Sequence, residues 1–222
     1  MTELMTGVAQ ISFANLVERA TELAWTGERS ILGITGAPGA GKTTLANALV
    51  EALGDAAVLV PMDGFHVANE LLIERNARDR KGAPDTFDVG GYIALLKRLR
   101  TQTDDVIYAP QFDRAADASI GSSVPVRKST PLVIAEGNYL LLENGGWGQV
   151  RPLLDQAWFI ATADGLRQQR LILRHMDFGL TGGQAREWAL GTDEHNAQLV
   201  SATRSAADLV ACVIDVPRPS SF

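Results

Sequence analysis

The sequence predicts an α/β fold in which a mostly parallel central sheet is flanked by helices. Short apolar runs alternate along the chain with segments of helical periodicity, which is typical of parallel sheets. A glycine-rich loop stands between one of the first apolar runs and the helix that follows it. The 222 residues, 46% of them hydrophobic, fit one large domain with its own core. We therefore expect a single domain over residues 1–222.

The first half of the chain alternates helices with two buried strands. Apolar side chains recur at helical spacing in three segments, and in a fourth that ends in a charged stretch. These predicted helices cover residues 12–26, 42–53, 66–79 and 92–100. The predicted strands are the apolar runs at residues 30–35 and 57–60, and residues 82–88 read as a loop.

The second half opens with a polar, irregular stretch and then returns to alternation. Within residues 104–130 only two short strands are expected, at 106–109 and 124–127. Apolar runs predict further strands at 131–135, 157–161 and 209–216. Between the last two strands we expect an arginine-rich helix at 164–176, a glycine-rich break at 179–183 and a helix continuing to about residue 205.

Composition excludes several classes of protein. The formal net charge is −6, whereas a general nucleic-acid binder needs a basic face, so we expect no nucleic-acid partner. The longest apolar runs are too short to cross a bilayer, so we expect no membrane insertion. Cys212 is the only cysteine, which excludes an intrachain disulfide and suits a reducing compartment. The first ten residues do not resemble a signal peptide, and we expect a cytoplasmic protein.

The glycine-rich loop has the pattern of a phosphate-binding loop. Residues 36–43 read GAPGAGKT, in which glycines let backbone N–H groups face phosphate oxygens at the start of a helix. Lys42 can reach the β- and γ-phosphates, and the Thr43 hydroxyl can bind Mg²⁺. The fold expected is therefore that of a P-loop NTPase. The predicted ATP site comprises Gly36, Ala37, Pro38, Gly39, Ala40, Gly41, Lys42, Thr43 and Thr44.

Two acidic residues follow buried strands that we expect beside this loop. Asp63 comes just after the run at 57–60, and Glu136 directly follows the run at 131–135. Ligands of open α/β sheets bind at the carboxyl ends of strands, so both carboxylates are predicted to lie near the γ-phosphate. Asp63 could accept a proton from an attacking hydroxyl, although Asp-Gly is also a common turn pair.

Five segments in this order resemble the phosphoribulokinase/uridine kinase superfamily. They read GAPGAGKT, MDGFHVANELL, KGAPDTFDVGGY, YAPQFDR and VIAEGNYLLL. Within the superfamily they look most like bacterial pantothenate kinases and their sugar-transport-associated relatives. Where pantothenate kinases carry tyrosine and histidine, this chain has Phe112 and Arg114, and only Asp113 keeps the acid of the tyrosine-aspartate pair of uridine kinases.

The resemblance implies an ATP- and Mg²⁺-dependent kinase with an acceptor-side insertion at 80–130 and a lid at 167–190. It implies that Asp63 is the base toward the acceptor hydroxyl. Lys42 and the lid residue Arg174 would stabilise the transferring phosphoryl group, and Thr43 and Glu136 would lie at the metal. Arg114 would contact the acceptor, and Asn196 and Arg204 match a late polar pair. Members of the superfamily are often dimers or larger, which makes a homodimer an open expectation.

Two further residue groups complete the prediction. His66 stands three residues after Asp63, where it can bind the acceptor or orient the carboxylate. Arg167, Arg170 and Arg174 have spacings that place them on one helix face, which predicts either a lid that clamps phosphates or a solvated surface.

The predicted activity is transfer of the γ-phosphoryl group of ATP to a hydroxyl of a small metabolite. Sugars, pantothenate-like compounds and nucleosides all stay open as acceptors. The alternative is a P-loop ATPase or nucleotide-dependent switch that has no small-molecule acceptor.

Overall fold

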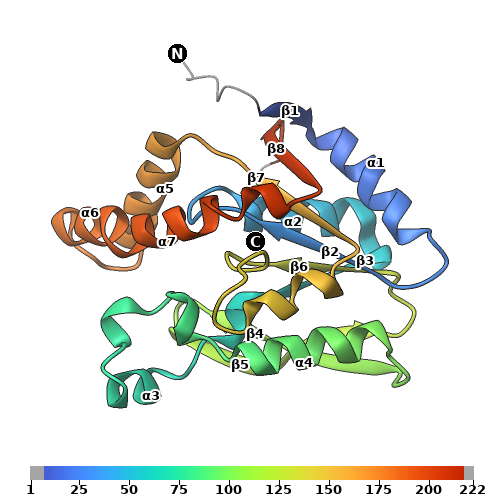
Figure 1. Ribbon diagram of the computed structural model, residues 1–222, viewed down its shortest axis with the longest axis horizontal. Coiled ribbons are helices and arrows are strands. Elements are labelled where there is room, and N and C mark those ends of the chain that lie inside the picture. Colours follow the sequence, from blue (N-terminus) through green and yellow to red (C-terminus); the bar gives the residue numbers. More distant parts are fainter. Residues whose placement is uncertain (1–7, 218–222) are drawn as a thin grey trace.

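The computed structural model describes residues 8–217 and contains a six-stranded parallel sheet in the order β1-β8-β7-β2-β6-β3 (Figure 1). The strands are β1 (Ala9–Ser12), β2 (Ser30–Thr35), β3 (Ala57–Pro61), β6 (Leu132–Glu136), β7 (Gln156–Ile160) and β8 (Leu209–Ile214). The predicted α/β fold is confirmed. Strand β1 was not expected, because its four residues are half polar and it pairs only with β8 from the other end of the chain.

Helices cover both faces of the sheet, and each face has its own hydrophobic core. Helices α1 (Phe13–Ala24) and α2 (Lys42–Leu53) pack on one face, where Leu16, Leu45 and Ile34 are fully buried. Helix α4 (Val89–Arg100) and the segment after β6 cover the other. Since both faces are covered, β2 and β6 are buried along their whole length and read as continuous apolar runs.

The segment 80–130, expected to be an acceptor-side insertion, is more regular than predicted. Two strands, β4 (Val106–Asp113) and β5 (Ala118–Arg127), form a long antiparallel hairpin where an irregular stretch was expected. Many of its residues are exposed, so no apolar run marks it. The helix expected over 66–79 is wrong in extent. Only α3 (Asn69–Glu74) is α-helical, and the chain turns at Asn76, whose φ is +49°.

Three helices, which lie together on the left of Figure 1, occupy and extend the region predicted as a lid: α5 (Asp164–Asp177), α6 (Gly182–Leu190) and α7 (Thr192–Ser201). The helix predicted through to residue 205 is wrong, because Gly191 separates α6 from α7. The glycine-rich break predicted at 179–183 is shorter in the structure, because α6 already begins at Gly182. Thr181 caps this helix in a capping box with Gln184. Within residues 8–217, no helix combines the length and apolarity that a membrane span requires.

Candidate active site

The phosphate loop joins β2 to α2, and two of its glycines are required by close backbone contacts. Gly36 and Gly39 have φ of +149° and +78°. A Cβ on Gly36 would lie 2.5 Å from the Ile160 carbonyl oxygen, and one on Gly39 would lie 2.5 Å from that of Arg167. The loop is thus pressed against β7 and the lid helix α5. Helix α2 begins at Lys42, so its free N–H groups lie at the loop.

Lys42 is buried beneath the loop with its ammonium among charged groups. Its Nζ donates a hydrogen bond of 3.1 Å to the carbonyl oxygen of Ala37, and the residue is 7% exposed. Burial lowers the pKa of the Lys42 ammonium, while the carboxylates of Glu136 and Asp63 act in the opposite direction. The ammonium therefore has acidic neighbours and a buried position from which it can reach an anion.

Glu136 lies at the carboxyl end of β6, between the strands that carry the loop and Asp63. In the sheet it is in register with Ile34 of β2 and Pro61 of β3. The Thr43 hydroxyl donates a 3.2 Å hydrogen bond to its Oε2. Burial raises the pKa of the Glu136 carboxyl to about 7, although Lys42 opposes this shift. The structure thus places the two predicted metal ligands together.

Asp63 follows β3 in a short 3₁₀ turn, Met62–Phe65. Its carboxylate is 30% exposed and faces the hairpin, from which Arg114 approaches to 3.5 Å. His66 lies at the end of the same turn, and its Nδ1 is 2.8 Å from the carbonyl oxygen of Asp63. Since a carbonyl only accepts, Nδ1 carries the proton and Nε2 of the neutral ring is an acceptor.

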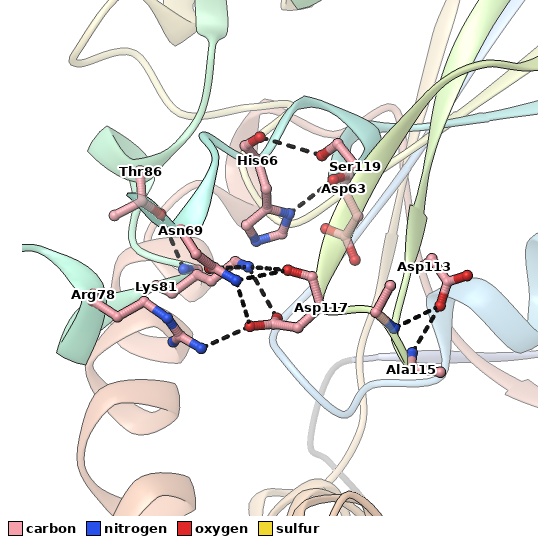
Figure 2. Close-up of polar contacts among 12 residues, drawn as sticks. Asp63, His66, Asn69, Arg78, Lys81, Thr86, Asp113, Ala115, Asp117 and Ser119 are labelled. Carbon is pink, nitrogen blue, oxygen red and sulfur yellow. Dashed lines mark hydrogen bonds and ion pairs between the residues drawn. The ribbon is translucent and has the colours of Figure 1, made fainter. Parts of the chain in front are cut away.

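The His66 ring is held between two aromatic rings. The ring centroids of Phe87 and Phe112 lie 4.1 and 4.6 Å from its own. Burial lowers the pKa of the His66 imidazole, and the Asp63 carboxylate opposes the shift. The ring is therefore kept neutral and fixed in place, and it lies beside Asp63 (Figure 2).

The three arginines predicted to share one face of the lid helix have different surroundings in the structure. Arg167 is 2% exposed and bonds Asp164 and Glu194 inside the lid. Arg170 lies at the loop, with Nη1 3.4 Å from the Gly39 carbonyl oxygen. Arg174 lines the main cavity, which also reaches the phosphate loop and the β4–β5 hairpin. Burial lowers the pKa of the Arg174 guanidinium, and nearby Arg114 lowers it further.

A cavity of about 520 Å³ joins the phosphate loop, the insertion and the lid. It receives every predicted site side chain outside the loop: Asp63, His66, Arg114, Glu136 and Arg174. Lys42 and Thr43 also line it. It then extends beyond them along the insertion toward α6 and α7, which leaves space for a second compound next to a nucleotide.

A second cavity of about 340 Å³ lies on the other side of the loop. Gly41, Thr44, Thr162, Arg170 and Val213 are among the residues that line it. Its lining is more apolar than that of the main cavity, and it borders the start of α2. A planar ring attached to phosphates held in the loop could lie there.

Sequence reasoning did not assign four polar residues that line the main cavity or hold it together: Asn69, Arg78, Lys81 and Asp117. Lys81 stands in the KGAPDTFD segment, which was the available signal. Asn196, noted only through the resemblance, is 3% exposed and lines the cavity, and its Oδ1 has no hydrogen-bond partner within residues 8–217. Arg204 does not line it.

The chain and its fold have clear counterparts among known proteins. No profile of a known protein family matches the chain. A Schizosaccharomyces pombe protein named "Putative uridine kinase" is 33% identical over 210 residues, which cover 90% of this chain and 89% of that protein. A crystal structure titled as a "putative fructose transport system kinase" from Silicibacter sp. TM1040 is 36% identical, with a TM-score of 0.82 over 90% of this chain and 98% of that one.

A third relative agrees in fold alone. The structure of YFH7 from Saccharomyces cerevisiae, titled as a "P-loop containing kinase with a circular permutation" and also termed putative, is 18% identical. Its TM-score is 0.78 over 92% of this chain and all of that one. The predicted P-loop fold is confirmed by these comparisons.

Proposed function

This chain belongs to the phosphoribulokinase/uridine kinase superfamily of P-loop kinases, and we propose that it phosphorylates its acceptor in the cavity between the phosphate loop, the insertion and the lid. It is an ATP-dependent kinase that uses a hydroxyl of a small molecule as acceptor. The relatives' names, and the resemblance of the sequence, suggest sugars, nucleosides and pantothenate-like compounds as candidate acceptors.

In this proposal the loop amides and Lys42 hold the β- and γ-phosphates. Arg174 and Arg114 approach from the lid and the hairpin, so three cations surround the position of the transferring group. Phosphoryl transfer places little covalent demand on the protein, and catalysis depends on positioning and on charge. The second cavity, which borders the loop at Gly41 and Thr44, would hold the nucleotide base.

The residues present fit a bound Mg²⁺. The Thr43 hydroxyl and the Glu136 carboxylate lie 3.2 Å apart at the loop, and both are oxygen donors of the kind that Mg²⁺ prefers. Within residues 8–217 no cluster of three or more acidic, histidine or cysteine side chains forms a complete metal cage, which suits an ion completed by phosphates and water. Mg²⁺ bound there would neutralise charge on the phosphates.

Asp63 would accept the proton of the acceptor hydroxyl. That oxygen forms a bond to the γ-phosphorus, the bond from the γ-phosphorus to the β-γ bridging oxygen breaks, and ADP leaves with the electron pair. His66 Nε2 would accept a hydrogen bond from the acceptor, because Nδ1 is already committed to the Asp63 carbonyl oxygen. The homodimer and the cytoplasmic location stay predictions.

One observation carries the proposal: Glu136 at the end of β6 and Asp63 just after the neighbouring β3 share one cavity with Lys42, and that cavity continues past all three. The test measures ADP release with and without a panel of sugars, nucleosides and hydroxy acids. Binding of each compound is measured in parallel by thermal shift with a non-hydrolysable ATP analogue. Hydrolysis that no compound accelerates, with no shift by any, would favour the ATPase alternative.

A further inference from the structure

The far end of the main cavity is built around Asp117, at the tip of the β4–β5 hairpin. Its φ is +49°, a left-handed conformation that aspartate tolerates better than most residues. Its main-chain carbonyl oxygen accepts hydrogen bonds from Asn69 Nδ2 at 3.1 Å and Lys81 Nζ at 2.8 Å. Its carboxylate accepts from the same two side chains and from Arg78. The hairpin tip is thereby fixed to the start of α3 and to the segment that follows it.

Lys81 has no donor left for a ligand. Its side chain is 7% exposed, and Nζ bonds Asn69 Oδ1 at 2.7 Å in addition to the two oxygens of Asp117. An ammonium has three protons, so these contacts use all of them. Lys81 also lies over the ring of Phe112, with Nζ 4.8 Å from the centroid. Its charge remains in the cavity wall, while its hydrogen bonds hold the hairpin.

Arg78 differs from Lys81 because most of its guanidinium is uncommitted. Within residues 8–217 its side chain makes one hydrogen bond, from Nη2 to Asp117 Oδ2 at 2.7 Å. Its side chain is 42% exposed and lines the same cavity as Asp63. Nε and Nη1 are therefore available as donors. One carboxylate also faces two cations here, so the group of Arg78, Lys81 and Asp117 carries a net charge of +1.

This positive charge lies on the side of the cavity where the acceptor is proposed to bind, away from the proposed nucleotide site. In Figure 2, Arg78 and Asp63 lie on opposite sides of His66 and Asp117. Lys42 and Arg174 line the main cavity too, but together with loop residues they also form a smaller pocket whose lining does not include Arg78. A molecule whose hydroxyl lies at Asp63 and whose body passes His66 would bring its distal end to Arg78.

We infer that the acceptor carries an anionic group, a carboxylate or a phosphate, at the end remote from its reacting hydroxyl, and that Arg78 binds this group. The inference rests on the proposed placement of the acceptor. A planar guanidinium with free donors matches the oxygens of either anion. Asp117 and Lys81 act as positioning residues, because they fix Arg78 and contribute its surrounding charge without free donors of their own.

The test compares compounds that share a skeleton and differ in one charged group. Three pairs serve as probes: glycerol with D-glycerate, pantothenol with pantothenate, and fructose with fructose 6-phosphate. Phosphorylation of each is measured by ADP release, with kcat and KM determined separately. The first two pairs report a carboxylate and the third a phosphate. We expect an anionic member to be the better substrate, with the difference mainly in KM.

Arg78→Gln is then compared with Arg80→Gln. Arg80 lies on the same 3₁₀ turn, but it pairs with Asp85 and does not line the main cavity. Loss of one charged hydrogen-bond partner should raise KM for the anionic acceptor about 10- to 100-fold in Arg78→Gln, with kcat and the neutral member little changed. Arg80→Gln should behave as the wild type.

Two results would overturn the inference. A neutral member that is preferred over its acidic or phosphorylated partner shows that no anion is recognised. Equal losses for both members of a pair in Arg78→Gln show that the residue only supports the fold of the hairpin. Neither result affects the kinase assignment, which fails only if no hydroxyl compound of either charge stimulates ADP release or binds.

Discussion

Arg114 Nη2 lies 3.5 Å from Asp63 Oδ2, so the hairpin supplies a cation to the carboxylate at the end of β3. Both side chains are partly exposed, and such a pair adds little to stability. Its consequence is positional. Arg114 can exchange Asp63 for a phosphate oxygen at small cost, which frees the carboxylate to face an acceptor hydroxyl.

Lys42→Met tests the charge beneath the phosphate loop. The Lys42 ammonium should stabilise the transition state more than the bound substrate, so its removal should lower kcat about 10²- to 10³-fold. Melting temperature without ligand should not fall, because burial already disfavours the Lys42 ammonium and methionine has a similar shape. Steady-state kinetics and thermal unfolding measure the two effects. Near-normal kcat would remove Lys42 from the transition state.

The lid arginines separate into a catalytic and a structural residue. Arg174→Gln should lower kcat more than nucleotide affinity, because Arg174 lines the cavity and approaches on the lid. Arg167→Gln should instead lower the melting temperature, because it leaves Glu194 without its buried partner. Comparing kcat and melting temperature in both variants checks the division. Matching losses in the two variants would contradict it.

Local patterns predicted most of this site, because its parts follow apolar strands directly. The loop, Asp63 and Glu136 each come within a few residues of a buried run, and the parallel order of β2, β6 and β3 brings them together. Asp117 could not be predicted in this way. Its partner Asn69 is 48 positions away, and they meet only because an exposed hairpin folds back.

Contacts between distant parts of the chain also explain why the roles of the lid arginines could not be predicted. Helical spacing places Arg167 and Arg174 near one another along α5, yet it does not show which of them meets an acid from another helix. Arg167 is turned inward because it pairs with Glu194 on α7. The break at Gly191 was missed because a single glycine is often tolerated inside a helix, and Ala185, Ala189 and Ala197 keep four- and eight-residue spacings across it.

Gly39→Ala tests the contact between the loop and the lid. Alanine at a φ of +78° costs about 1–2 kcal/mol, and its Cβ would also meet the Arg167 carbonyl oxygen. Gly27→Ala is the control, since Gly27 has a φ of +96° but nothing within 4 Å of an added Cβ. Denaturant unfolding should show a larger loss for Gly39→Ala. Equal losses would mean that α5 yields without cost.

His66 should make stability depend on pH. Burial lowers its folded-state pKa below the ordinary value of 6.5, so the unfolded chain binds more protons in that range. Its contribution is therefore full above pH 6.5 and is lost as the pH falls below it. Glu136, with a raised pKa, acts in the opposite direction between pH 4.5 and about 7.

His66→Asn isolates this effect, because asparagine can still donate to the Asp63 carbonyl oxygen but does not titrate. The difference in unfolding free energy between wild type and variant, measured from pH 5 to 8 by denaturant unfolding, cancels the contribution of Glu136. We expect the wild type to lose stability relative to the variant on the acidic side. A constant difference would show that burial does not lower the pKa of His66.

Asp63→Asn separates a proton acceptor from a metal ligand. The variant keeps the shape and one hydrogen-bond acceptor of the side chain but cannot take a proton. Acceptor phosphorylation should fall about 10²- to 10⁴-fold, toward the lower end because a loose transition state needs little base assistance. ATP affinity should be almost unchanged, since the loop and Lys42 hold the phosphates, and ATP hydrolysis by water should fall less.

Asp113→Asn is the matched control, because Asp113 lies on the same hairpin as Arg114 but does not itself line the cavity, and its carboxylate accepts hydrogen bonds from the N–H groups of Ala115 and Ala116. Phosphorylation and hydrolysis rates are measured in both variants at several Mg²⁺ concentrations. If both rates of Asp63→Asn fall together and are restored by raised Mg²⁺, then Asp63 belongs to the metal site. The base must then be another group of the cavity, and Glu136 is the next candidate, because its raised pKa of about 7 leaves it able to take a proton near neutrality.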